Sequence, residues 1–137
     1  MEHRGLQGFI SRHRYAIVSS VSAAGTPQSA IVGIAVTSEL EIVFDTLRST
    51  RKYRNLMARS ACSVVVGSGE QTLQFEGIAR EPQGDELLRC RENYFSAWPD
   101  GRERLDWPDL THLVITPQWI RYSDYDQSPP SICEMRF

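Results

Sequence analysis

Hydroxyl and guanidinium side chains gather between residues 44 and 55, where the sequence reads FDTLRSTRKYRN. The apolar run over residues 40–44 predicts a strand that leads into this stretch. Thr46 stands at the exit of that strand, and Ser49 or Thr50 can cap the helix expected to follow. Such residues at a strand-to-helix junction are suited to holding a phosphate group.

The predicted helix begins with an unusual amount of positive charge. Its apolar side is expected to consist of Tyr53, Leu56 and Met57. The cations are Arg48, Arg51, Lys52 and Arg54. Cations are disfavoured at a helix N-terminus, where the helix dipole is already positive, so a bound anion would resolve the conflict. The alternative is that these side chains project into water and each costs a few tenths of a kcal/mol, within the range of about 0.3–1 kcal/mol for exposed charges.

The residue order F-x-T-x-x-S-x-R-K-x-x-N-L over residues 44–56 resembles a segment of the pyridoxamine 5′-phosphate oxidase-like, FMN-binding split-barrel family. In that family the segment holds the FMN phosphate. The resemblance extends in element order over residues 15–125, and it is specific only over residues 44–56. It implies a homodimer with flavin at the subunit interface.

The resemblance also assigns expected roles to individual positions. The residues that would bind the phosphate are Thr46, Ser49 or Thr50, Arg51 and Lys52. Those on the strand expected to follow the edge of the flavin ring are Ile31, Val32 and Gly33. The positions from which the partner subunit would reach the flavin are Gln74 and Trp119. For Trp119 the alternative is a simple core or interface aromatic.

The sequence also departs from the family pattern. Ala30 and Ala35 occupy the positions at which the true oxidases carry basic residues, so weaker binding of the phosphate is expected. The Arg- and Trp-containing C-terminal signature of the true oxidases is absent from residues 123–137, so vitamin B6 oxidation is not expected. No catalytic residue can be named, and Asp45 is expected to pair with Arg48 or Arg51.

The element order predicts a mainly β fold, a six-stranded antiparallel split barrel with inserted helices, in a single domain over residues 1–137. The expected strands cover residues 15–21, 29–36, 40–44, 61–67, 72–81 and 110–122. The expected helices cover residues 3–12, about 50–59 and 85–98, with an N-terminal helical segment over 1–13 and a C-terminal tail over 124–137. That tail is polar and contains proline, and it is expected to drape over a neighbouring subunit.

Two residues inside the predicted strands need a local explanation. Gly33 is expected to mark either a bulge or a place where a ligand approaches the backbone. Pro117 requires an edge strand or a bulge, because proline cannot donate to the hydrogen-bond ladder.

The polar segment 99–108, which has no periodicity, is expected to form a lid or edge loop.

Composition excludes several classes of function. The chain has 137 residues, a net charge of −2 and a pI near 5.9, which gives no electrostatic basis for binding nucleic acid. Residues 1–6 lack the apolar region of a signal peptide, and no apolar run approaches a membrane span. The three cysteines and three histidines are scattered, so neither a metal site nor a disulfide framework is predicted, and a cytoplasmic protein with reduced cysteines is expected.

The leading hypothesis is an FMN-dependent oxidoreductase acting on an unidentified small molecule. In such a protein the cofactor performs the electron or hydride transfer and the protein positions it. The alternatives are a non-catalytic flavin-binding or carrier module, a relative that uses the deazaflavin F420, and a degenerate relative that binds haem or only a protein partner.

Overall fold

The computed structural model describes residues 1–137, except for the side chain at position 68. The helices are α1 (His3–Arg12), α2 (Arg51–Ala58) and α3 (Gly84–Ala97), followed by the 3-10 helix η1 (Pro99–Arg104). The strands are β1 (Tyr15–Val21), β2 (Pro27–Gly33), β3 (Ala35–Val36), β4 (Ile42–Leu47), β5 (Ala61–Ser68), β6 (Gln71–Arg80), β7 (Leu110–Asp124) and β8 (Ser131–Arg136). None of the described helices is long and apolar enough to cross a membrane.

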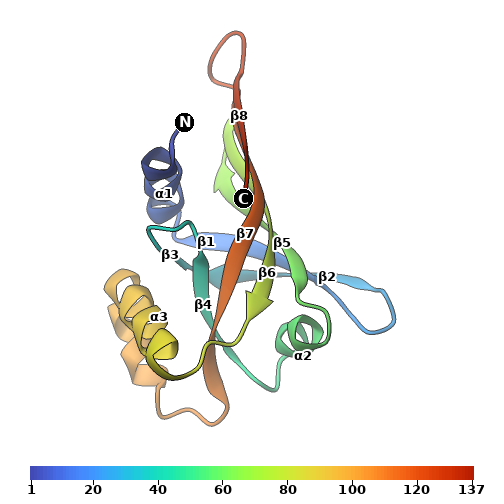
Figure 1. Ribbon diagram of the computed structural model, residues 1–137, viewed down its shortest axis with the longest axis vertical. Coiled ribbons are helices and arrows are strands. Elements are labelled where there is room, and N and C mark those ends of the chain that lie inside the picture. Colours follow the sequence, from blue (N-terminus) through green and yellow to red (C-terminus); the bar gives the residue numbers. More distant parts are fainter.

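The strands form one curled antiparallel sheet in the order β2-β1-β5-β6-β7-β4-β3, and β8 pairs with the outer part of β7. The long strand β7 runs through the length of the molecule (Figure 1). Its first half pairs with β4, and its second half pairs with β8 and projects with it from the barrel. Helix α3 lies on one side of β7 and α2 on the other (Figure 1). The prediction of a mainly β split barrel with inserted helices is confirmed.

The sheet has eight strands where six were predicted. The predicted strand over residues 29–36 is interrupted at Ile34 and becomes β2 and β3, which pair with β1 and β4 respectively. These two pieces are neighbours in the chain but stand at opposite ends of the strand order, so the split of the barrel falls between them. The tail, for which no strand was predicted, supplies β8. In this strand Ile132 is exposed, whereas Met135 packs on the core.

Two hydrophobic clusters hold the fold together. The larger fills the barrel, where Phe44, Phe75 and Leu113 are buried, and α1 adds Leu6, Phe9 and Ile10 to it. The apolar residues of α1 recur at helical spacing, as predicted, and burial of that face is what stabilises so short a helix. The smaller cluster lies between α3 and the outer side of the sheet and contains Val43, Cys90, Tyr94, Phe95 and Val114.

Pro117 lies at a bulge, one of the two placements, edge strand or bulge, that its residue type allowed. Gly77 pairs with Pro117 and Glu76 pairs with Trp119, so Gln118 is the additional residue of β7. A Cβ atom on Gly77 would lie 2.5 Å from the carbonyl oxygen of Thr116. The close approach of the two backbones therefore requires glycine opposite the proline.

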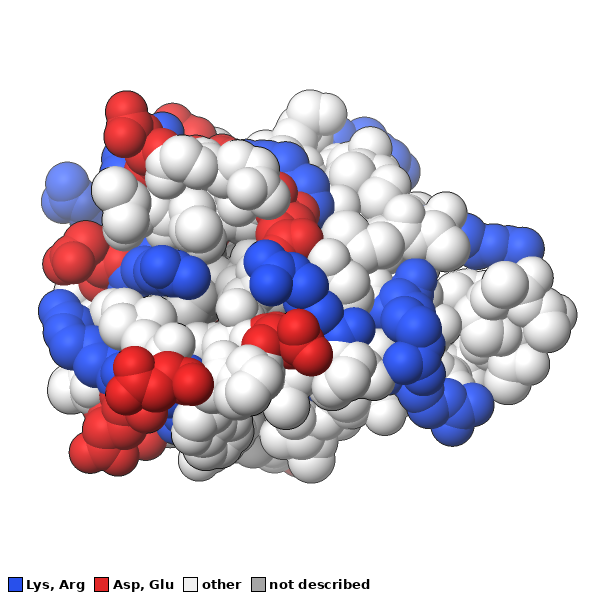
Figure 2. Space-filling view, turned by 90° about the horizontal axis from the view of Figure 1, so that it is seen from below, with Lys and Arg blue, Asp and Glu red and all other residues white. Residues whose placement is uncertain are grey.

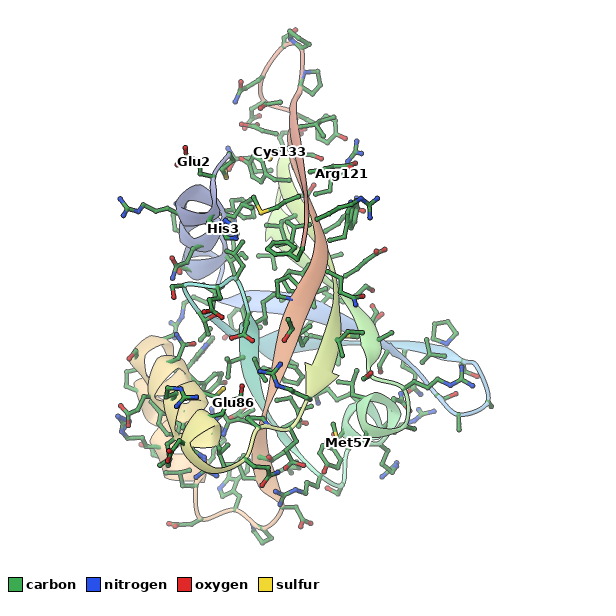
Figure 3. The ribbon with its side chains drawn as sticks, in the orientation of Figure 1. Glu2, His3, Met57, Glu86, Arg121 and Cys133 are labelled. Atoms are coloured by element: carbon green, nitrogen blue, oxygen red, sulfur yellow. The ribbon has the colours of Figure 1, made fainter. Side chains whose placement is uncertain are left out.

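The helix over residues 51–58 differs from its prediction in one respect. Tyr53 packs against the core and Leu56 is buried, as expected. Met57, labelled on α2 in Figure 3, is 41% exposed, so its assignment to the apolar face was wrong. Within the segment 99–108, predicted to be an irregular loop, residues 99–104 form the helix η1.

Candidate functional site

The turn between β4 and α2 is organised by two threonine hydroxyls. Thr50 is the N-cap of α2, and its Oγ1 accepts a hydrogen bond from the backbone N–H of Tyr53 at 3.3 Å. The same hydroxyl donates to the carbonyl oxygen of Leu47 at 2.9 Å and lies 3.1 Å from Oγ1 of Thr46, which is buried. Ser49 is exposed and does not cap the helix. Thr50 therefore fixes the start of α2 relative to the end of β4.

The four cations at this helix start have different partners. Arg48 forms an ion pair with Glu81 at 2.7 Å. The guanidinium of Arg54 donates to the carbonyl oxygen of Ser49 at 2.8 Å. Among the described residues, neither Arg51 nor Lys52 forms an ion pair with a carboxylate. Two positive charges at the N-terminus of α2 are thus left without an anionic partner.

Arg51 and Lys52 face a common hollow between α2 and the β1–β2 hairpin. The hollow has a volume of about 440 Å³ and is lined by Val18, Ser20, Gln28, Ser29, Ala30, Arg51 and Lys52. None of these lining residues is acidic. On the face of the molecule that carries α2 and α3, Figure 2 shows Lys and Arg mixed with Asp and Glu on the α3 side, and with few acidic neighbours on the α2 side. The hollow is therefore suited to an anion.

Partial burial affects the ammonium group of Lys52. Desolvation lowers the pKa of Lys52, and the nearby carboxylate of Asp45 acts in the opposite direction. An ammonium that has lost part of its hydration gains more from a bound anion than an exposed ammonium does. Arg51 and Lys52 thus fit a phosphate monoester, which can receive two charge-assisted contacts here.

The expected pairing of Asp45 with Arg48 or Arg51 was wrong. The carboxylate of Asp45 instead accepts from Nε of Arg104 at 2.8 Å and from the hydroxyl of Tyr94 at 3.3 Å. Asp45 is on β4, and its side chain points to the side covered by α3 and η1, away from the hydroxyl of Thr46. Because successive strand residues face opposite sides of the sheet, Asp45 anchors η1 and leaves Arg51 free of its charge.

The three residues on β2 that were expected to follow the flavin ring lie in different environments. Ile31 is 73% exposed on the outer side of the sheet, whereas Val32 is buried in the core. A Cβ atom on Gly33 would lie 2.7 Å from the ring of Trp98, so it is this indole that approaches the backbone of Gly33. Strand β2 pairs only with β1 in the described part of the chain, which leaves backbone groups along its other edge.

Gln74 and Trp119 lie together, but not at the hollow that Arg51 faces. Both line a second hollow of about 470 Å³ on the outer side of the sheet, together with Val65 and Glu76. The structure thus separates the predicted residues into a cationic group at α2 and a group on the outer sheet face. The resemblance requires such a separation, since it assigns Gln74 and Trp119 to the partner subunit.

The sequence did not single out Gln28, which lines the cationic hollow with Arg51. It lies opposite Ser20 in the β1–β2 ladder, and this register brings it beside the start of α2. A polar residue just before the strand predicted over residues 29–36 gives no signal of such a contact. Only the position of the hairpin over α2 identifies it.

A comparison with models of protein families identifies a match over residues 3–124, to the family described as pyridoxamine 5′-phosphate oxidase. Among curated proteins, no sequence matches the chain.

Solved structures resemble the whole fold at low sequence identity. A heme binding protein from Mycobacterium smegmatis superposes with a TM-score of 0.82 at 18% identity, over 99% of this chain and 58% of that protein. The heme storage protein HutZ from Vibrio cholerae gives 0.71 at 17% identity, over 83% and 88% of the two chains. A pyridoxamine 5′-phosphate oxidase-related, FMN binding protein from Nostoc punctiforme gives 0.68 at 11% identity, over 98% and 90%. At these identities the likeness establishes the fold alone.

Proposed function

The chain belongs to the pyridoxamine 5′-phosphate oxidase-like family, and we propose that it is a flavoprotein that binds FMN with the phosphate at the start of α2. The observation that carries this proposal is the hollow between α2 and the β1–β2 hairpin. There Arg51 and Lys52 face a cavity whose lining contains no acidic residue. A phosphate would complete the charge balance of the helix N-terminus.

We propose further that the protein is an oxidoreductase acting on a small molecule. The flavin, when bound, supplies hydride or electron transfer. The chain's own residues would hold and orient it: Thr50 fixes the helix start, and Arg51 and Lys52 would bind the phosphate. The alternative of a non-catalytic flavin carrier uses the same residues. Steady oxidation of reduced nicotinamide in air by the FMN-loaded protein would support the enzyme, and no turnover would support the carrier.

Haem is a second candidate ligand, because two proteins of similar fold are described as heme binding and heme storage proteins. Haem carries two propionate carboxylates, which Arg51 and Lys52 could also bind. The residues that line the hollow include no His, Cys, Met or Tyr to bind the haem iron, so the hollow favours FMN, or the deazaflavin F420 with its phosphate-containing tail, over haem. Titrating the protein with each of the three ligands would decide among them.

We propose that the flavin lies between two copies of this chain. The outer sheet face carries a row of apolar residues at matched positions of neighbouring strands: Ile31 of β2 pairs with Ile17 of β1, and Ile17 pairs with Val65 of β5. Their exposed fractions are 73%, 42% and 45%. The row continues to Gln74 of β6. Burial of such a row against a second copy would be favourable, at about 25 cal/mol per Å² of apolar surface.

Replacement of both unpaired cations tests the phosphate site. We expect Arg51→Ala combined with Lys52→Ala to weaken FMN binding by about 3–6 kcal/mol, since each charge-assisted contact contributes about 1.5–3 kcal/mol. Binding of riboflavin, which lacks the phosphate, should change little. Arg54→Ala is the matched control, because Arg54 is on the same helix and bonds to the carbonyl of Ser49. Equal loss of riboflavin binding, or unchanged FMN affinity, would contradict the assignment.

Replacement of Ile31 tests the interface. A carboxylate at the most exposed position of the apolar row should convert a dimer into monomers, so we expect Ile31→Asp to halve the mass measured by light scattering. Leu88→Asp is the control, since Leu88 is also exposed but lies on α3. A wild-type protein that is monomeric in the presence of FMN would refute the proposed dimer.

A further inference from the structure

The side-chain amide of Gln28 lies between two groups of hydrogen-bond donors. On one side, Nδ2 of Asn55 is 2.6 Å from the amide of Gln28. On the other side, the guanidinium nitrogens of Arg51 lie 2.5, 2.9 and 3.1 Å from the second terminal atom of that amide. An amide has one oxygen and one NH2 group, so it can direct its oxygen to only one of these neighbours at a time.

Asn55 connects this amide to the interior of the protein. Its Nδ2 also lies 3.1 Å from Oγ of Ser20, and both Asn55 and Ser20 are buried. A hydroxyl can donate or accept, and both amides can turn over. The three side chains Ser20, Asn55 and Gln28 can therefore form a continuous hydrogen-bonded row in either of two directions.

The two directions present different groups to the hollow. In the first, the oxygen of Gln28 accepts from Arg51, its NH2 group donates to the oxygen of Asn55, and Ser20 also donates to Asn55. In the second, the NH2 group of Asn55 donates to both Ser20 and Gln28, and the NH2 group of Gln28 faces Arg51 and the hollow. Two donors then face each other, and only an acceptor placed between them can satisfy both.

We propose that Gln28 is a phosphate-binding residue whose side-chain amide turns over when a phosphate enters this site. In the absence of an anion, its oxygen occupies the place of a phosphate oxygen and accepts from Arg51. When a phosphate enters, Arg51 donates to the phosphate, and the NH2 group of Gln28 turns to donate to it as well. The oxygen of Gln28 then accepts from Asn55, so the hydrogen bond between the two amides is kept in both states.

This inference rests on the proposed function only for the identity of the ligand that carries the phosphate. It also supplies a third side-chain donor at a site where Ala30 stands in place of the cation of the true oxidases. Ala35, the other such position, is buried beside α3 and lies away from the hollow. Unlike a carboxylate, a neutral amide can hold Arg51 in place and still release it to an anion. A carboxylate at position 28 would instead form a permanent ion pair with Arg51.

Two substitutions at position 28 test the role of the amide. Gln28→Glu should weaken FMN binding by about tenfold or more, and Gln28→Leu by about fivefold, the value of one lost hydrogen bond. Riboflavin binding should remain unchanged in both variants. Gln83→Leu is the matched control, because Gln83 is exposed at the start of α3, away from the hollow, and its side chain makes no capping hydrogen bond. FMN affinity of Gln28→Leu equal to or above that of the wild type would overturn the proposal.

A second measurement needs no substitution and no flavin. In the ¹⁵N-labelled wild-type protein, addition of inorganic phosphate should shift the side-chain NH2 resonances of Gln28 and Asn55 together, and sodium chloride at equal ionic strength should not. Absence of that shift would overturn the proposal even if FMN binds. A shift with phosphate in a protein that takes up no flavin would support the anion site and refute the proposed FMN function.

Discussion

Acidification should destabilise this protein through one buried histidine. His112 on β7 is 0% exposed, and its ring packs edge-on against Tyr94 at 5.2 Å and Phe95 at 5.6 Å between ring centroids. Neither ring nitrogen has a hydrogen-bond partner in the described part of the chain. Asp45, the residue paired with it on β4, is engaged with Arg104 and Tyr94. The site therefore accommodates a neutral ring and disfavours a charged one.

Burial lowers the pKa of His112 from 6.5 to about 4. Asp45 opposes this effect, while the cations Arg91 and Arg104 add to it. Because the unfolded chain binds the proton more readily than the native protein, the free energy of unfolding should fall as the pH is lowered from about 6.5 to 4. The loss is roughly 3 kcal/mol, at about 1.4 kcal/mol for each pH unit.

Urea unfolding followed by circular dichroism at several pH values between 4 and 8 measures this loss. We expect His112→Phe to remove the part of the pH dependence between 6.5 and 4, because phenylalanine retains the aromatic contacts and cannot be protonated. His3→Asn is the control, since His3 is exposed. A pH dependence of the same slope in His112→Phe and in the wild type would refute the reasoning.

Two further predictions concern packing and helix capping. Gly33→Ala should lower the free energy of unfolding by about 1–3 kcal/mol, because the added Cβ would lie 2.7 Å from the ring of Trp98. Gly8→Ala is the control: the nearest contact of its Cβ is at 3.4 Å, so it should be neutral or stabilising. Thermal unfolding measures both variants. Thr50→Ala should lower the free energy of unfolding by about 1 kcal/mol in the same measurement, because α2 loses its N-cap. Thr50→Ser should keep most of the wild-type stability. Equal stabilities for the Ala and Ser variants would show that the hydroxyl does not cap the helix.

Local chemistry was sufficient to predict the parts of the structure that depend on neighbouring residues. The apolar periodicity of residues 6–10 predicted α1. The missing N–H of Pro117 predicted either an edge strand or a bulge, and the structure has the bulge. The N-cap at Thr50 was one of two candidates that the sequence offered, and the geometry of the turn chose between them. The collection of hydroxyls and cations over residues 44–55 is the basis of the proposed anion site, since the helix dipole acts within a single turn.

Tertiary structure decided which of those side chains are available. The sequence alone could not distinguish Arg48, which is neutralised by Glu81, from Arg51, because the carboxylate comes from the end of β6. Strand alternation turned Asp45 toward Arg104, and the register of the β1–β2 hairpin brought Gln28 beside Arg51. The local sequence determines which residues are charged and where the helix begins. Which of those charges form ion pairs or hydrogen bonds depends on which distant strands the sheet places side by side.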